Sequence, residues 1–476
     1  MNKLSRLLPI FLVLVFGFVF FYRLGSFTLY DWDEAWYADI ARNMVISSDY
    51  MNMRGLGMRY SDHPPLGFWL MAGSYKLFGI NELTTRLPSA ALGLGSIYLI
   101  YLIGKLLFKR RSIGFAAAIV LGTSVWYTMR VRSGNLDSPW IFFNLGLVYY
   151  AIKARHNFRY FPLAMLFFAA LFMTKTLVGS FAIFLVLLPN LSHLLNIKKN
   201  WQSILLGLLL FAALVVPWYH LNIATDPGFL YHHFGQIGTR SASLASFLRL
   251  RPELPLFYLH MGIRKWYYIW IISLLYLALT LKIFKKNVAY VIFWQLIVFY
   301  PFLTSEFTEI WHLIPVYLPI SLTIAYAVYD GLKRALKLAS RFFPLPATVY
   351  LLFYLVIFSS SGFIQLQNMW KEIIPANPGY IPDEVDIATQ AQALAGTLYL
   401  DYNWGPRASF YSGRPAGGLG FLPDDGHRLR NLYISRTGPF QIITNPNNLV
   451  DLDSNQINYH LISRNNSFVL LGKDAE

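Results

Sequence analysis

The chain of 476 residues contains no cysteine. Disulfide bonds, thiolate metal sites and thiol nucleophiles are therefore excluded. Charged residues are scarce at 13%, whereas a soluble protein of this length carries roughly a quarter. The sequence also lacks a phosphate-binding glycine-rich loop, a Gly-x-Ser-x-Gly elbow and a Rossmann fingerprint. It thus gives no signal for a nucleotide site or a serine-hydrolase site.

What the chain has in abundance is apolar surface, with 56% hydrophobic and 17% aromatic residues. The net charge of +16 comes from short basic clusters between apolar runs, so we attribute it to the positive-inside rule and not to nucleic-acid binding. With about 20 apolar residues per span, we predict an α-helical polytopic membrane protein with about 11 transmembrane helices, and up to about 13. They lie near residues 6–23, 88–108, 113–131, 136–154, 158–174, 176–196, 202–222, 266–284, 288–305, 311–330 and 344–363.

The connections between these helices are of two kinds. One kind is short and basic, with Asp330 as its only acid, and belongs on the cytoplasmic side. The other kind includes the long loops 24–87 and 223–265 and most of the acidic residues and histidines. An odd number of spans sends the C-terminal tail to this same side. We therefore expect the chemistry on the extracytoplasmic side.

The tail differs in composition from the rest of the chain, because it gains Asn, Asp, Gly and Pro and loses long apolar runs. We predict a transmembrane domain at 1–371 and a small extracytoplasmic α/β domain at 372–476. Residues 383–394 favour a helix. The predicted strands are 397–402, 408–411, 440–444 and 457–463.

An acidic stretch, Asp31–Val45, follows the first apolar run directly. Asp31 and Glu34 have the spacing of a capping box, which predicts a helix start. Carboxylates at the edge of a membrane are costly, so they indicate a function, although a solvated amphipathic helix is the alternative. Aromatic and apolar residues at i, i+4 indicate a helix at the membrane–water boundary: Trp32, Trp36, Ile40 and Met44.

Three further positions on this side carry polar groups. Asp62 and His63 precede two prolines at the start of an amphipathic helix, where they can hold a phosphate, a metal or a proton. The alternative for Asp62 is a helix cap. Arg86 begins the second span, where it either meets a lipid phosphate or extends to the headgroups.

A second group of candidates follows the third span. Asp137 starts a hydrophobic helix and is either a cap or a partner of Arg130 and Arg132, which could instead bind an anion. Lys175 interrupts an apolar run, which favours a function. Adjacent histidines at 232 and 233 point apart on a helix, and no His-x-x-x-His spacing occurs, so the case for a protein-held zinc is weak.

The order of these elements resembles the lipid-linked-sugar glycosyltransferases of the GT-C superfamily. The most similar branch contains the bacterial proteins related to protein O-mannosyltransferases and to the 4-amino-4-deoxy-L-arabinose transferases of lipid A. The resemblance covers roughly residues 5–330, and the first outer loop is its specific part. The matching segments are Asp33-Glu34, Tyr37-Ala-Asp-Ile-Ala-Arg42, His63-Pro-Pro65, Leu77-Phe-Gly79, Arg86-Leu-Pro-Ser89, Leu136-Asp137, Thr174-Lys175, Pro217-Trp-Tyr219 and the region of Pro315 and Pro319.

This resemblance implies a GT-C fold in the bacterial inner membrane and a periplasmic active site. The donor is a polyprenyl-phosphate-linked sugar, and the acceptor is a hydroxyl of a lipid, a glycan or a protein. Transfer inverts the anomeric centre, with Asp33 as general base and Glu34 shaping the site. The aminoarabinose pattern has a lysine where this chain has His63. The expected substrate-binding residues are Arg42, Asp62, His63, Arg86, Arg132, Asp137, Lys175, Arg240 and His312.

No cofactor is firmly implied, although Asp62 leaves a divalent metal ion open. The partners are the lipid-linked donor, the acceptor and membrane lipids, with no nucleic acid. The alternative function is a polytopic transporter or lipid flippase of the cell envelope. Transporters usually contain internal repeats and charges near mid-membrane, whereas here no repeat is visible and the polar residues gather on one side. A structural scaffold would not need Asp33, Arg86 and Lys175 together.

Overall fold

The computed structural model describes residues 4–176, 180–235, 249–339, 346–374, 377, 379–402, 405–419 and 427–473. The chain forms two compact units, which we name by their content. The helical unit comprises residues 1–23, 62–67 and 88–376. The mixed unit comprises residues 24–61, 68–87 and 377–476. Each unit is assembled from three separate segments of the chain. The domain boundary predicted between residues 371 and 372 stays a prediction.

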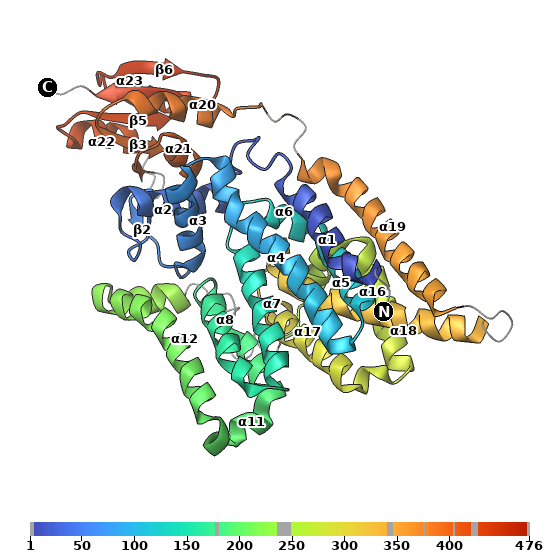
Figure 1. Ribbon diagram of the computed structural model, residues 1–476. Helices are drawn as coiled ribbons and strands as arrows, with labels where there is room; N and C mark the ends of the chain where they lie inside the picture. Colours follow the sequence, from blue (N-terminus) through green and yellow to red (C-terminus); the bar gives the residue numbers. More distant parts are fainter. Residues whose placement is uncertain are drawn as a thin grey trace. The chain divides into compact units, whose positions relative to one another are not determined.

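The helical unit is built from apolar helices at the places where the apolar runs predicted them (Figure 1). Five helices of the described chain are long and apolar enough to cross a membrane, or six if one bent pair forms a single span. The chain is thus a multi-pass membrane protein, and the predicted number of spans stays a prediction. The helices are α1 Leu4–Phe21, α4 Glu82–Phe108, α5 Arg111–Gly122, α6 Val125–Val131, α7 Asp137–Ala154, α8 Phe161–Phe172, α10 Phe184–Leu187, α11 Leu191–Leu195, α12 Ile197–Thr225, α15 Glu253–Ile263, α16 Lys265–Leu279, α17 Lys286–Thr304, α18 Ile314–Ala339 and α19 Ala347–Ile373.

Two of the predicted spans are interrupted. The run expected at 113–131 is the pair α5 and α6, bent by 75°. The run expected at 176–196 is a series of short segments within the described residues, from Phe181 to Leu195, with Pro189 among them. Short helical turns join several helices: η1 Phe158–Tyr160, η2 Phe181–Ile183, η3 Leu188–Asn190, η4 Tyr231–Gly235, η6 Lys282–Phe284 and η7 Ile310–Leu313.

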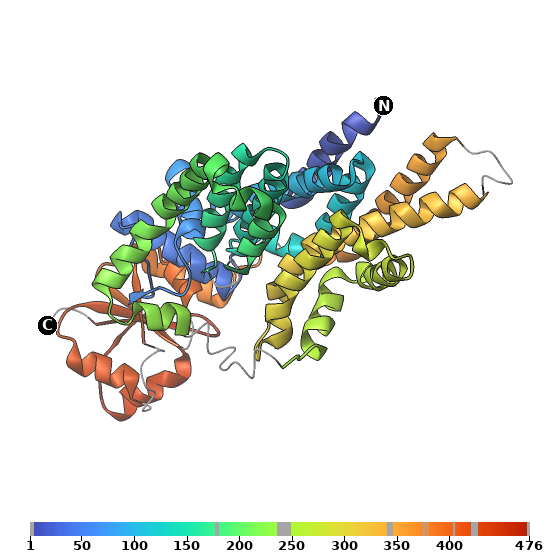
Figure 2. The same ribbon diagram turned by 90° about the horizontal axis from the view of Figure 1, so that it is seen from below.

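Helix α18 forms the centre of one part of the helical unit. It packs against α5, α16, α17 and α19 (Figures 1 and 2). Its first half is buried on all sides, from Ile314 to Ala325. A helix that is apolar around its whole circumference can be accommodated only inside a bundle. The other helices α7, α8 and α12 pack in sequence beside one another.

The mixed unit contains most of the loop 24–87 and residues 377–476, which we call the C-terminal domain. Its five-stranded sheet has the order β4-β3-β5-β7-β6, in which β3 pairs parallel with β4 and β5, and β7 pairs antiparallel with β5 and β6. Residues 408–411 were expected as a strand but form a helix, because Pro406 is pre-organised for a first helical turn. The elements are α2 Asp33–Ser47, β1 Arg54–Gly55, β2 Met58–Arg59, α3 Leu66–Phe78, α20 Asp383–Gln390, η8 Ala391–Ala393, β3 Thr397–Asp401, α21 Pro406–Tyr411, β4 Ala416–Gly418, α22 Arg428–Ser435, β5 Phe440–Thr444, η9 Pro446–Asn448, α23 Leu449–Ser454, β6 His460–Arg464 and β7 Val469–Lys473.

Arg132 connects two helix ends of the helical unit. It donates to the carbonyls of Val19, Phe20 and Tyr22 at the end of α1, at 2.6, 3.1 and 2.9 Å. It also donates to the carbonyl of Ile373 at the end of α19, at 3.2 Å. Terminal carbonyls of a helix need such donors when they are buried. The geometry therefore favours a structural role for Arg132 over the expected contact with substrate.

We expect the substitution Arg132→Gln to destabilise the protein by about 1–3 kcal/mol, because buried carbonyl groups lose their donors. The measurement is the thermal unfolding midpoint in detergent micelles. Arg159→Gln is the control, since Arg159 is exposed in the short turn η1. Equal midpoints for both variants would contradict the structural role.

Candidate active site

The backbone at the start of α2 has an unusual conformation. Trp32 has φ 66° and ψ −129°, and its side chain is 70% exposed. Asp33 follows as the first helical residue and is half-buried. A non-glycine residue persists at positive φ only when its surroundings fix it, and such residues gather at functional sites. Asp33 thus follows directly on a strained backbone conformation.

The capping box expected between Asp31 and Glu34 is absent. Asp31 Oδ1 accepts a hydrogen bond from the N–H of Trp32 at 3.0 Å, and Glu34 Oε2 accepts from the N–H of Tyr30 at 2.7 Å. The positive φ of Trp32 prevents the regular geometry of a capping box at this helix start. The hydrogen bonds to Asp31 and Glu34 fix the backbone before and after Trp32.

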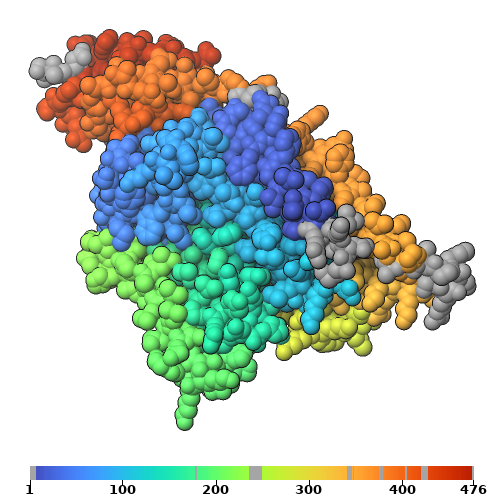
Figure 3. Space-filling view, viewed as in Figure 1, coloured from blue at the N-terminus to red at the C-terminus, as the bar shows by residue number. Residues whose placement is uncertain are grey.

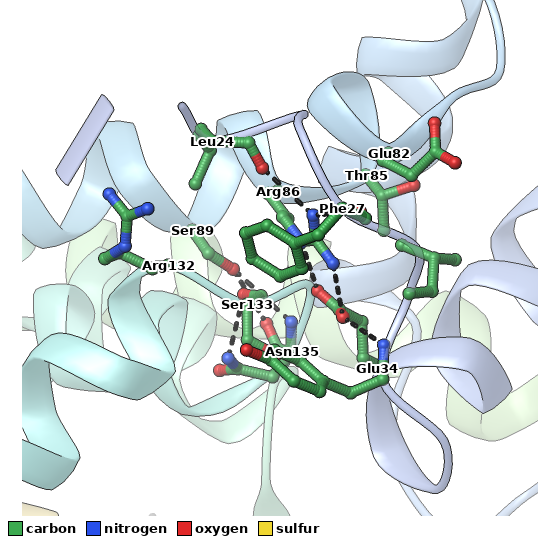
Figure 4. Close-up of polar contacts among 12 residues, drawn as sticks. Leu24, Phe27, Glu34, Glu82, Thr85, Arg86, Ser89, Arg132, Ser133 and Asn135 are labelled. Atoms are coloured by element: carbon green, nitrogen blue, oxygen red, sulfur yellow. Dashed lines mark hydrogen bonds and ion pairs between the residues drawn. The ribbon is translucent and has the colours of Figure 1, made fainter. Parts of the chain in front are cut away.

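Glu34 forms a buried ion pair with Arg86 (Figure 4). Arg86 Nε and Nη2 lie 2.8 and 2.9 Å from the two carboxylate oxygens of Glu34. The remaining donors of Arg86 go to the carbonyls of Leu24, Phe27 and Thr28, at 2.9–3.0 Å. All five guanidinium N–H groups are thus used. The geometry assigns Arg86 a structural role that fixes the segment before Asp33, rather than the expected role as a ligand of phosphate.

Asp39 and Arg42 form a second buried pair on α2. Arg42 Nη2 lies 2.9 Å from Asp39 Oδ1, and Ser409 of the C-terminal domain donates to the same oxygen at 2.7 Å. Arg42 also donates to the carbonyls of Phe410 and Arg414, each at 3.0 Å. The geometry therefore places Arg42 in a contact between α2 and the C-terminal domain, and not in the expected contact with substrate.

In the helical unit, Asp137 binds two cations. Arg130 Nε lies 2.6 Å from Asp137 Oδ2, and Lys175 Nζ lies 2.5 Å from Asp137 Oδ1. One carboxylate between two cations leaves a net charge of +1. An ammonium group has three donors, and among the described residues Lys175 uses one of them, toward Asp137. This cluster can accept an anion without losing its internal ion pairs.

His63 belongs to the electrostatic environment of this cluster. The pKa of its imidazole is well below the usual value, because burial disfavours the charged form and because the positive charge of Lys175 opposes protonation. His233 and His312 act in the same direction, whereas Asp137 acts against it. His63 is thus neutral at neutral pH and can donate or accept a hydrogen bond.

Three other predicted residues have different environments. His312 takes part in a capping box at the start of η7, where its Nδ1 accepts from the N–H of Glu309 at 3.1 Å. Asp62 is exposed in the segment before α3. Arg240 lies outside the described residues.

No metal site is apparent in the part of the chain that the structure describes. Within it, no group of three His, Cys, Asp or Glu side chains is arranged to hold a metal ion. The described residues thus provide no three-ligand site for a divalent ion, and we derive no step through a metal.

The sequence did not reveal a polar contact between Thr176, Tyr219 and His233. The hydroxyl groups of Thr176 and Tyr219 lie 2.6 Å apart, and His233 Nε2 lies 2.9 Å from the Tyr219 hydroxyl. His233 is fully buried, and its ring stacks on Phe229 at 5.2 Å. Of this contact, the sequence analysis had identified only the motif Pro217-Trp-Tyr219. Because Thr176 is the neighbour of Lys175, this contact supports the turn that carries the ammonium group.

Comparison with known proteins gives the same assignment as the motifs. Residues 62–219 match the family model described as dolichyl-phosphate-mannose-protein mannosyltransferase. An undecaprenyl phosphate-α-4-amino-4-deoxy-L-arabinose arabinosyl transferase of Proteus mirabilis is 27% identical over 49% of this chain and 43% of its own length. A protein of the same name from Pseudomonas paraeruginosa is 26% identical over 69% of this chain and 61% of its own length. The matched part thus spans about half the length of these curated relatives.

Solved structures extend the similarity to almost the whole chain. ArnT from Cupriavidus metallidurans, bound to undecaprenyl phosphate, has a TM-score of 0.71 at 18% identity and covers 97% of both chains. The oligosaccharyltransferase of Archaeoglobus fulgidus has a TM-score of 0.58 at 10% identity and covers 93% of this chain. The resemblance predicted from the ordered motifs is therefore confirmed: the chain is similar in sequence to the arabinosyl transferases and has the fold of ArnT.

Proposed function

We propose that the chain is a membrane glycosyltransferase that moves a sugar from a polyprenyl-phosphate-linked donor to a hydroxyl acceptor on the periplasmic face of the bacterial inner membrane. The observation that carries the proposal is the fold, which matches ArnT with bound undecaprenyl phosphate over nearly its full length. The names of the relatives support a lipid-linked sugar donor. The basic clusters on alternate loops support the periplasmic orientation.

In the proposed reaction, the acceptor oxygen attacks the anomeric carbon of the sugar. The bond from that carbon to the phosphate oxygen breaks, so the configuration inverts and polyprenyl phosphate leaves. The carboxylate of Asp33 takes the proton of the acceptor hydroxyl. Its assignment rests on the family motif and on the strained turn that ends at Asp33.

The leaving phosphate gains negative charge as the bond breaks, and cations directed at its oxygens lower the barrier. Lys175 is the best-suited cation among the described residues, because Asp137, itself paired with Arg130, holds it in place and two of its donors are not used within that part of the chain. We propose that His63 adds a hydrogen bond to the same phosphate. In this proposal Arg86, Arg132 and Arg42 support the structure and do not touch the substrate.

Asp33→Asn is expected to reduce sugar transfer by at least about 10²-fold, since general bases contribute about 10²–10⁴-fold. Binding of undecaprenyl phosphate should stay unchanged, because that lipid does not need the base. The measurement is transfer of labelled sugar to extracted envelope glycolipids and glycoproteins, with Asp31→Asn as a control two residues away.

Full transfer activity in Asp33→Asn would refute the assignment of the base. Movement of a lipid or solute by wild-type protein in liposomes, with no transfer product, would instead identify the chain as a flippase or transporter.

The role of His63 predicts a pH dependence of phosphate binding. A bound phosphate favours the charged imidazolium, so the pKa of His63 is higher in the complex than in the free protein. The complex takes up a proton, and affinity for undecaprenyl phosphate therefore rises as pH falls through the pKa that His63 has in the complex, and levels off below its lower pKa in the free protein. His63→Lys should bind at least as tightly at pH 7 and lose this increase, since its ammonium is charged throughout.

The control is His63→Gln, which cannot be protonated and reports the titration of the phosphate alone. Binding is measured by tryptophan fluorescence with the lipid in detergent between pH 5 and 8. The same pH dependence in the wild type and in His63→Gln would remove His63 from the phosphate site.

A further inference from the structure

The C-terminal domain and the first outer loop share one hydrophobic core. Leu56, from the turn between β1 and β2, is 2% exposed and lies in a cluster with residues of the C-terminal domain such as Ile387, Leu398 and Leu400. Trp36 of α2 packs against the same cluster. The carbonyl of Leu56 also accepts from the N–H of Gly418 at 3.4 Å, at the end of β4. The core of the C-terminal domain is thus completed by residues from a distant, earlier part of the sequence.

The two parts also make contact through buried charges. Asp39 and Arg42 are both buried, and each has partners in the last turn of α21 or in the residues after it, besides the bonds they make to Asn43 and Leu56. The carbonyl of Phe410 accepts from Arg42 at 3.0 Å, and the carbonyl of Ser409 accepts from it as well. The carbonyls at a helix C-terminus carry the negative end of its dipole, which favours a cation there. In the space-filling view, the atoms of the first loop lie directly against those of the C-terminal domain (Figure 3).

Tyr411 makes a separate contact before α2 begins. Its hydroxyl donates to Glu82 Oε1 at 2.8 Å and accepts from the N–H of Leu29 at 2.9 Å. Leu29 follows directly on Thr28, whose carbonyl binds Arg86. One hydroxyl of the C-terminal domain therefore fixes the segment that leads to Asp33.

We propose that the C-terminal domain is a positioning element for the catalytic helix α2. It holds the chain on both sides of Asp33, at Leu29 through Tyr411 and at Asp39 and Arg42 through α21. Tyr411 and Ser409 are positioning residues that act through these contacts and do not touch the substrate. The inference rests on the proposed role of Asp33 and explains why a domain of separate sequence is joined to the loop that carries the base.

The physical reason lies in the alignment that proton transfer demands. Asp33 is the first residue of a helix and follows directly on the strained Trp32. Misplacement of a catalytic group by about 1 Å can cost about 10²-fold in rate. Anchors on both sides of the turn restrict this displacement.

The test uses the full-length protein with Tyr411→Phe, which removes only the hydroxyl, and Ser409→Ala, which removes one donor to Asp39. Tyr459→Phe is the matched control, because its hydroxyl binds Asp453 within the C-terminal domain at 3.0 Å. Two quantities are measured: the kinetic constants of sugar transfer as the concentration of the polyprenyl-phosphate donor varies, and the hydrogen–deuterium exchange of residues 24–47.

We expect kcat to fall about tenfold in Tyr411→Phe and in Ser409→Ala, while KM for the donor stays within about twofold, because alignment is lost and donor binding is not. Hydrogen–deuterium exchange of residues 24–47 should be faster in both variants than in the wild type. Tyr459→Phe should resemble the wild type in both measurements.

Unchanged kcat and unchanged exchange in both variants would overturn the inference while the proposed function stands. Faster exchange throughout the chain, with activity that follows the folded fraction, would also overturn it, since that result indicates general destabilisation. A wild-type protein that transfers no sugar would refute the proposed function instead. If the wild type transfers no sugar, hydrogen–deuterium exchange still tests the contacts of Tyr411 and Ser409. Unchanged exchange of residues 24–47 in both variants would refute the proposed positioning of α2, and faster exchange there would support it.

Discussion

The buried charge of Arg86 is the constraint on which the first outer loop depends. A guanidinium removed from water is strongly destabilising unless every donor is satisfied. Glu34 supplies two acceptors and the carbonyls of Leu24, Phe27 and Thr28 supply the others. These bonds determine the path of the chain from residue 24 to the start of α2. The unusual backbone of Trp32 is tolerated because the residues on both sides of it have little freedom.

Long apolar runs predicted much of the helical unit, whereas contacts between residues distant in sequence were largely beyond prediction. The helices α1, α4, α7, α12, α17, α18 and α19 lie where hydrophobicity predicted them. Strand 408–411 was wrong because four residues cannot distinguish a period of 2 from a period of 3.6, and Pro406 begins a helix. The core shared by Leu56 and the C-terminal domain has no local signal at all.

The candidate site shows the same division. Motif order pointed to Asp137 and Lys175 among other residues, and the ion pair between these two shows that the helix start at 137 and the turn at 175 are close in space, which the sequence did not predict. The partners of Arg42 and Arg132 are backbone carbonyls. Every residue has a carbonyl, so no pattern of side chains can identify which of them an arginine will bind. Sequence therefore identified the cations but could not separate the structural ones from those available to a ligand.

The number of N–H donors that each cation already uses within the protein distinguishes the structural cations from those available to a ligand. Arginine presents five donors in a rigid fork, which suits it to satisfying several fixed carbonyls at once, and Arg86 uses all five in this way. Lysine is a compact charge with three rotatable donors, and Lys175 gives one of them to Asp137 within the described chain. The neutral state of His63 adds hydrogen-bonding capacity without a further positive charge to repel Lys175. A site that must bind a lipid phosphate and later release it benefits from this arrangement, because the ammonium stays paired in both states.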